Sequence, residues 1–129
     1  MPELPEVEFA MQRLRRVARG RTVEAVRAHH ASQRRGLPAH HRRRVRGRRI
    51  VEVARRGKHQ LLTLDDGATL LVHFRLNGDW AFTARSAPLP DYARVSFELS
   101  GGRRVSLTDS RALCTVIWLA PGRAAELNS

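Results

Sequence analysis

The first six residues of the chain, Met1-Pro2-Glu3-Leu4-Pro5-Glu6, place a proline one position after a methionine. If Met1 is removed, Pro2 exposes a secondary amine. An α-amino group has a pKa of about 8, so a useful fraction of this amine is neutral and nucleophilic near neutral pH. Glu3 lies beside it as a potential acid or base. The terminus therefore offers a nucleophile and a proton carrier on adjacent residues.

The same hexapeptide also has a purely structural interpretation. A proline disfavours the α region for the residue before it, so a helix is predicted to begin at about Pro5. Glu6 and Glu8 then lie near the helix start, where the helix dipole favours negative charge. On local chemistry alone, a helix start without a catalytic role is the favoured explanation.

Three further stretches carry residues that can bind or react, and each lies at a predicted strand end or turn. They are Arg56-Gly57-Lys58-His59, His73-Phe74-Arg75-Leu76-Asn77-Gly78 and Thr108-Asp109-Ser110-Arg111-Ala112-Leu113. Taken singly, each has an ordinary alternative: Lys58 fits a surface charge and His73 a hydrogen-bonded, partly buried histidine. Leu76 and Leu113 fit ordinary core positions, and on local grounds the structural alternative is favoured for each stretch.

The charge of the chain indicates a polyanionic partner. The net charge is +12, and residues 1 to 60 hold 17 Arg and Lys against 5 Asp and Glu, whereas residues 61 to 129 hold 7 against 7. Clustered cations favour phosphate backbones through counterion release, so nucleic acid is the leading partner and an acidic membrane surface the second. The densest run, residues 42–49, fits a solvated face better than direct phosphate contact. Lys58 is the only lysine, which hints that its position needs a compact ammonium group.

Length and composition indicate one globular domain over residues 1–129, with 42% apolar residues. No apolar run approaches the roughly 20 residues that span a bilayer, and the charged start does not resemble a secretory signal. We therefore expect a cytoplasmic protein without a membrane partner. The single Cys114 excludes an internal disulfide and a Cys-rich zinc site, and it fits a small core residue.

Hydrophobic spacing predicts the elements that must position these residues. Apolar residues recur at helical spacing from Pro5 to about Arg19, and residues 22–28 alternate as a strand. Residues 29–36 are predicted to form a loop, and a short helix follows at 38–46. Seven more strands are predicted at 50–53, 60–64, 69–74, 79–83, 92–99, 103–107 and 113–119. The fold class is therefore α+β: an antiparallel β-sandwich of about eight strands, flanked by a long N-terminal helix and a short second helix.

Taken together, the four reactive stretches resemble a known family. Their order and spacing are similar to those of the formamidopyrimidine-DNA glycosylase and endonuclease VIII family: Met1-Pro2-Glu3-Leu4-Pro5-Glu6-Val7-Glu8, Arg56-Gly57-Lys58, His73-x-x-Leu76-x-Gly78 and Thr108-Asp109-x-Arg111. The Leu-Pro version of the opening is closer to the formamidopyrimidine-DNA glycosylase branch. The resemblance covers essentially the whole chain but only the amino-terminal domain of the family. The helix-two-turns-helix element and the zinc-bearing hairpin are expected to be absent from this chain, so no metal or other cofactor is expected in it.

The resemblance implies a base-excision-repair DNA glycosylase with AP lyase activity, which removes oxidised bases of the 8-oxoguanine and formamidopyrimidine type. Pro2 would attack the sugar C1′ and form a Schiff base, while Glu3 would protonate the ring oxygen. Glu6 resembles a supporting carboxylate near the site. Lys58 and His73 resemble the residues that grip the phosphates of the kinked backbone. As a single domain, the chain is expected to be weak or incomplete in this activity.

The resemblance also assigns three residues to the duplex itself. Extruding the damaged nucleotide leaves a hole in the base stack, which Leu76, Arg111 and Leu113 would fill. Arg111 would hydrogen-bond the orphaned base, and the leucines would act as apolar wedges. The chain departs from the commoner family pattern here. Leu76 stands where Met is usual and Leu113 where Phe is usual, and Ser-Arg-Ala replaces Pro-Arg-Arg.

Two other functions remain open from the sequence: a non-catalytic DNA-binding domain of the same fold, and a basic RNA-binding protein. An intact Pro2-Glu3 pair favours the enzyme, because a pure binder has no need of a terminal amine. An aromatic content of 5% disfavours RNA binding through base stacking. We expect a monomer that acts on damaged double-stranded DNA in the bacterial cytoplasm, associated with the nucleoid.

Overall fold

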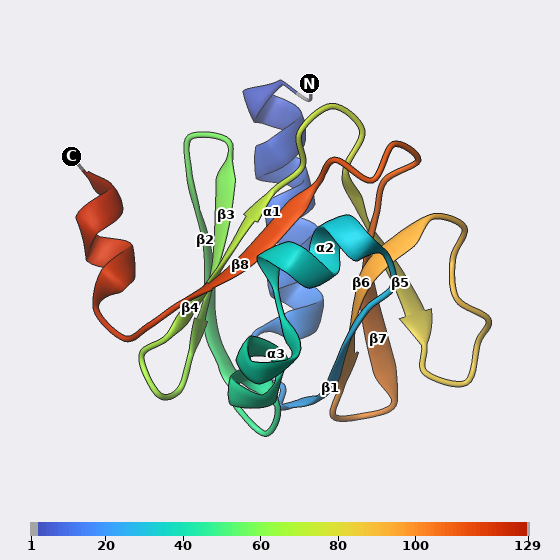
Figure 1. Ribbon diagram of the computed structural model, residues 1–129, viewed down its shortest axis with the longest axis horizontal. Coiled ribbons are helices and arrows are strands. Elements are labelled where there is room, and N and C mark those ends of the chain that lie inside the picture. Colours follow the sequence, from blue (N-terminus) through green and yellow to red (C-terminus); the bar gives the residue numbers. More distant parts are fainter. Residues whose placement is uncertain (1–2, 129) are drawn as a thin grey trace.

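The computed structural model describes residues 3–128 and contains two antiparallel four-stranded sheets, which face one another beside a long helix (Figure 1). The first sheet has the strand order β1 (Val23–Ala28), β6 (Ala93–Leu99), β7 (Arg103–Thr108) and β5 (Asp79–Ala84). The second has the order β2 (Ile50–Arg56), β3 (His59–Leu64), β4 (Thr69–His73) and β8 (Thr115–Leu119). The predicted α+β sandwich is confirmed.

Helix α1 (Leu4–Ala18) has the predicted position and a single buried face. The buried side chains recur three and four residues apart, as one face of a helix requires: Val7, Ala10, Met11, Leu14 and Ala18. The helix packs mainly on β2, where Arg15 pairs with Glu52 at 3.1 Å. Gly20, with a φ of 86°, lies just beyond the helix and turns the chain into β1.

Residues 29–36 were expected to form a loop, and this prediction was wrong. They contain helix α2 (Ala31–Gly36), whereas the short helix predicted at 38–46 is confirmed as α3 (Ala39–Val45). The His30 ring caps α2 by accepting a hydrogen bond from the Ser32 amide at 3.1 Å. Buried Gln33 donates to the carbonyl of Cys114 at 2.7 Å. Long-range contacts, rather than hydrophobic periodicity, therefore make this segment helical.

The strands match their predicted positions, with differences at the ends that have a physical cause. The turn at 65–67 joins β3 and β4, and the Ala68 amide donates to the Asp66 carboxylate at 3.0 Å. The strand predicted at 113–119 begins only at Thr115. The amides of Leu113 and Cys114 donate to a side chain instead of extending the sheet.

The core lies between the two sheets and under α1, and it is largely aliphatic. Its largest fully buried side chains include Leu14, Leu62, Leu70, Phe97 and Leu107. One polar contact also joins the sheets, because the Trp80 indole donates to the amide oxygen of buried Gln60 at 2.8 Å. The chain closes with a short 3₁₀ helix, η1 (Arg123–Asn128). Within residues 3–128, every helix is too short or too polar to cross a bilayer.

The turn between β4 and β5 depends on a close approach of backbone at Gly78. The Gly78 amide donates to the carbonyl of Phe74 at 3.1 Å. A Cβ at position 78 would lie 2.6 Å from both the Cα and the carbonyl oxygen of Phe74, closer than any ordinary contact. Only glycine therefore fits this turn without displacing backbone.

We expect Gly78→Ala to lower the free energy of unfolding by about 2 kcal/mol, because the added methyl group overpacks against backbone. Gly36→Ala is the matched control, since its nearest backbone atom, the Val116 oxygen, is 3.4 Å away. The measurement is urea unfolding of both variants. Equal effects of the two substitutions would contradict the steric role of Gly78.

Candidate active site

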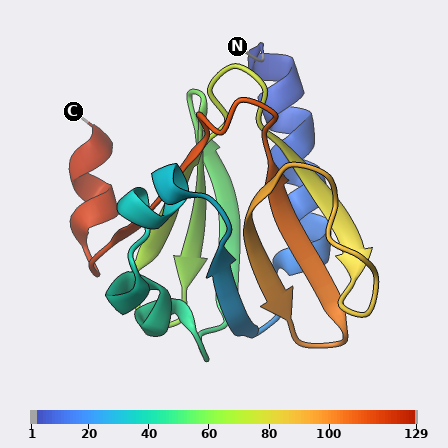
Figure 2. The same cartoon turned by 45° about the vertical axis from the view of Figure 1, so that its right-hand side comes forward.

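The four stretches that carry chemistry meet at one end of the molecule. They are the start of α1, the β2–β3 turn, the β4–β5 loop and the β7–β8 loop, and both views place them together at the top (Figures 1 and 2). We call this the reactive end. Segments separated by up to about a hundred positions in the sequence thus form one surface, which the sequence could suggest only through family resemblance.

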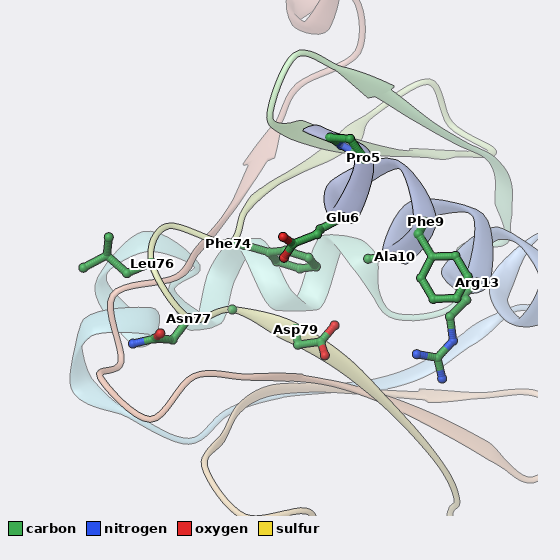
Figure 3. Close-up of a pocket in the computed structure, with 10 residues that line it drawn as sticks. Pro5, Glu6, Phe9, Ala10, Arg13, Phe74, Leu76, Asn77 and Asp79 are labelled. Carbon is green, nitrogen blue, oxygen red and sulfur yellow. The ribbon is translucent and has the colours of Figure 1, made fainter. Parts of the chain in front are cut away.

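The start of α1 contributes carboxylates and one wall of a pocket. Pro2 lies outside the described residues, but Glu3, to which it is bonded, is exposed at the N-cap of α1. Glu6, one turn on, lines a pocket of about 590 Å³ between α1 and the β4–β5 loop. In Figure 3 its carboxylate points into this pocket, and Leu76 lies on the side away from Phe9. The volume is within the usual range for small-ligand sites.

The β2–β3 turn holds half-buried Lys58 and is tied to α1 by one arginine. Arg55 donates from Nε to the Glu8 carboxylate at 2.7 Å and from a terminal nitrogen to the Gly57 carbonyl at 2.9 Å. The hydrogen bond from Arg55, followed by one from Gln12, lowers the pKa of Glu8. The ammonium-bearing turn therefore keeps a fixed relation to the helix that starts at the reactive end.

His73 ends strand β4 as a buried, neutral imidazole. Its Nδ1 accepts a hydrogen bond from the Arg75 amide at 2.9 Å, which leaves Nε2 as the nitrogen that carries hydrogen. His59 lies opposite on β3, with ring centroids 4.8 Å apart. Burial, together with the positive charges of Arg75, His59 and Lys58, lowers the pKa of His73 to about 4. At neutral pH His73 is therefore a hydrogen-bond donor without charge.

Leu76 is presented to solvent by the β4–β5 loop, and its side chain is 44% exposed. The residue before it, Arg75, has a φ of 61°, in the left-handed region. The equivalent arrangement recurs in the β7–β8 loop, where Ala112 has a φ of 55° and precedes Leu113, which is 46% exposed. Two leucines thus project from separate loops at the same end of the molecule.

The β7–β8 loop is organised by the buried carboxylate of Asp109. Its Oδ1 accepts a hydrogen bond from the Arg111 amide at 2.9 Å, and its Oδ2 accepts from Leu113 at 2.8 Å and from Cys114 at 2.7 Å. The side chains of Arg111 and Leu113 remain exposed. One anion that binds three backbone amides therefore defines the shape of the loop.

Two residues from other elements hold the same loop from behind. Gln33 on α2 donates to the carbonyls of Ala112 and Cys114, at 3.0 and 2.7 Å. Arg94 on β6 donates to the carbonyl of Asp109 at 2.7 Å. Burial and the nearby Asp109 raise the pKa of the Cys114 thiol to about 12, so this thiol is an inert core group.

Sequence reasoning named Asp109 within a motif but gave it no role, and it missed Arg55 and Gln33. The available signal for Asp109 was an acidic residue at a strand end, followed by a short loop whose amides it can cap. No local pattern distinguishes Arg55 or Gln33, because their partners lie far away in the sequence. Among the described residues, no group of three or more His, Cys, Asp or Glu side chains could hold a metal ion.

A comparison with protein-family models matches residues 1–116 to the formamidopyrimidine-DNA glycosylase N-terminal domain. The chain belongs to this family. Among curated relatives, formamidopyrimidine-DNA glycosylase of Rhizorhabdus wittichii is 34% identical over 116 residues, which are 90% of this chain and 42% of that protein. The protein of the same name from Geobacter sulfurreducens is 35% identical over 118 residues, covering 92% and 43%.

Solved structures agree on the fold. Lactococcus lactis Fpg in complex with DNA that contains an abasic site superimposes with a TM-score of 0.90 at 20% identity, covering 98% of this chain and 47% of that one. The complex of the same enzyme with DNA containing FAPY-dG gives a TM-score of 0.89 at 20% identity, covering 97% and 47%. The chain thus spans a little under half the length of these relatives and structures.

The role of Asp109 predicts a specific loss on its removal. Asp109→Ala should lower the free energy of unfolding by about 3 kcal/mol, because the backbone amides lose their charged acceptor. Ser110→Ala, an exposed change in the same loop, serves as the control and should be near neutral. Chemical unfolding of both variants checks this. A small loss in Asp109→Ala would contradict the organising role of the carboxylate.

The depressed pKa of His73 predicts a pH dependence of stability. Its folded pKa of about 4 lies below the unfolded value of about 6.5, so the unfolded chain takes up the proton first as the pH falls. The stability from His73 is therefore complete above pH 6.5 and decreases as the pH falls towards 4. Urea unfolding of His73→Gln should show a shallower pH dependence over this range than the unaltered chain. Exposed His40→Gln is the control, and identical slopes for the chain and His73→Gln would refute the assignment.

Proposed function

We propose that the chain is the catalytic amino-terminal domain of a DNA glycosylase with AP lyase activity, which excises oxidised bases from duplex DNA through Pro2. The observation that carries the proposal is the meeting of four separate sequence stretches at one end of the fold. These stretches carry acidic, basic and exposed apolar residues, and they lie beside the start of α1. The relatives bear the name formamidopyrimidine-DNA glycosylase, which supports this substrate class.

The chemistry follows from a secondary amine beside a carboxyl group. The Pro2 nitrogen attacks the sugar C1′, the bond from C1′ to the base breaks, and the base leaves with the bonding electrons and takes up a proton. Glu3 protonates the ring oxygen, so the sugar opens and an iminium forms between Pro2 and C1′. Loss of a C2′ proton to a base then expels the 3′ phosphate, because the iminium accepts the electron pair.

Lys58 and His73 are the proposed phosphate-binding pair. Lys58 brings a positive charge, whereas His73 donates from Nε2 while remaining neutral. The tie from Arg55 to both Glu8 and the Gly57 carbonyl supports this role, because it fixes the Lys58 turn relative to α1. Phosphate contacts of this kind orient the backbone without reading sequence.

The exposed side chains of the two loops suit the space that an extruded nucleotide leaves. Leu76 and Leu113 present apolar surface. Arg111, two residues before Leu113, is also exposed, so its guanidinium is available for hydrogen bonds. The pocket lined by Glu6 and Leu76 would receive the extruded base. Leucine cannot stack as an aromatic ring does, so opposite-base preference would differ from members with Phe at position 113.

We also propose that the protein acts as a monomer in the bacterial cytoplasm at the nucleoid. The named curated relatives are bacterial, and a base-excision enzyme must reach chromosomal DNA. The second candidate function, a non-catalytic DNA-binding domain, is supported by the net charge of +12, because backbone binding needs a basic surface but no nucleophile. Only the enzyme would form a covalent bond with DNA, so a test for a covalent adduct distinguishes the two candidates.

Borohydride trapping on an oligonucleotide with an abasic site tests the proposed nucleophile. The chain, with loss of Met1 verified by mass, should form a covalent adduct that maps to Pro2, and Pro2→Gly should lose most of it. Glu3→Gln should reduce removal of 8-oxoguanine by about 100-fold or more while leaving DNA affinity nearly unchanged. An adduct that maps to Lys58, or no adduct at all, would favour the alternatives.

A further inference from the structure

A second basic surface lies between β1 and α3, away from the reactive end. It is a groove of about 370 Å³, and its lining includes four arginines and a single acidic residue: Arg27, Arg42, Arg43, Arg46 and Glu24. We call this the basic groove. It contains part of the densest run of charge in the chain, which the sequence pattern alone assigned to a solvated face.

The carboxylates around the basic groove are already engaged elsewhere. Glu24 forms an ion pair with Arg85, which also pairs with Glu98 at 3.1 Å. Arg27 reaches Glu98 only at 3.5 Å. In the described part of the chain, the exposed side chains of Arg43 and Arg46 have no carboxylate partner. The groove therefore carries positive charge that the fold does not neutralise.

The basic groove and the reactive end lie at opposite ends of the molecule. Both views place α3 at the bottom and the start of α1 at the top (Figures 1 and 2). Helix α1 spans 15 residues, about 22 Å at 1.5 Å per residue, and runs between these levels. Beyond it, the Gly20 amide donates to Ile50, and the Val23 amide at the base of β1 donates to Arg48. Phosphates bound at the reactive end therefore leave the basic groove free.

We propose that the basic groove binds the phosphate backbone of a second DNA duplex while the reactive end holds the first. Several guanidinium groups along one groove suit a polyanion, because each contact releases counterions and guanidinium binds phosphate bidentately. No lining residue is aromatic, so the groove lacks the stacking platform that single-stranded nucleic acid uses. The choice of DNA as the polyanion rests on the proposed function; the second site goes beyond it.

A bridging assay tests the second site on the complete 129-residue chain. The chain is loaded on immobilised duplex that contains an abasic-site analogue, and capture of a free fluorescent undamaged duplex is measured. Arg43→Glu/Arg46→Glu removes two exposed, unpaired guanidiniums and should weaken capture about tenfold or more while retaining the loaded chain. The control, Arg16→Glu/Arg103→Glu, has the same net charge and alters exposed residues outside the basic groove, so it should capture like the unaltered chain.

Three outcomes would overturn the proposal. They are no capture by the unaltered chain, equal capture by both double variants, or capture of an acidic polyglutamate peptide in preference to duplex. The outcome of the bridging assay can be distinguished from the outcome of borohydride trapping at Pro2. Loss of trapping at Pro2 with capture still dependent on Arg43 and Arg46 would leave the second site standing. Normal trapping with unaffected capture would remove the second site alone.

Discussion

The buried carboxylate of Asp109 binds three backbone amides, and the working surface of the protein depends on this one interaction. A buried anion is unfavourable unless it is fully hydrogen-bonded, so the amides of the β7–β8 loop must close around it. Gln33 and Arg94 then donate to carbonyls of the same loop from behind and connect it to α2 and β6. The loop is consequently part of the folded core on one side and free to contact a partner on the other.

At the start of α1, one side chain likewise connects two elements: Arg55 binds both α1 and the β2–β3 turn. Arg55 joins Glu8 on the helix to the turn that carries Lys58, so the first turns of α1 and the β2–β3 turn keep a fixed relation. His73 adds a donor whose neutrality is a product of burial and neighbouring positive charge. Of these two side chains at the reactive end, half-exposed Lys58 therefore carries the positive charge, whereas buried His73 is uncharged at neutral pH.

The periodic spacing of apolar residues predicted the long helix and the strands. Features that depend on contacts between distant residues could not be predicted in this way. The α1 helix and the eight strands follow from regular apolar spacing. Helix α2 was missed because six residues built around a buried Gln33 have no apolar period. The site residues could be located through family resemblance, since the order of motifs is readable. The role of Asp109 and the state of His73 were not readable, because both arise from packing between strands.

Arg75 and Ala112 each hold a left-handed backbone conformation immediately before an exposed leucine. Such a conformation costs an L-residue about 1–2 kcal/mol, and neither position is glycine. The surrounding hydrogen bonds of His73 and Asp109 maintain it. The entropy of ordering both loops is therefore lost when the chain folds and not when a partner binds. In the proposed function, Leu76 and Leu113 would reach a base step from loops that are already ordered, so each encounter would test the step without waiting for a loop to close.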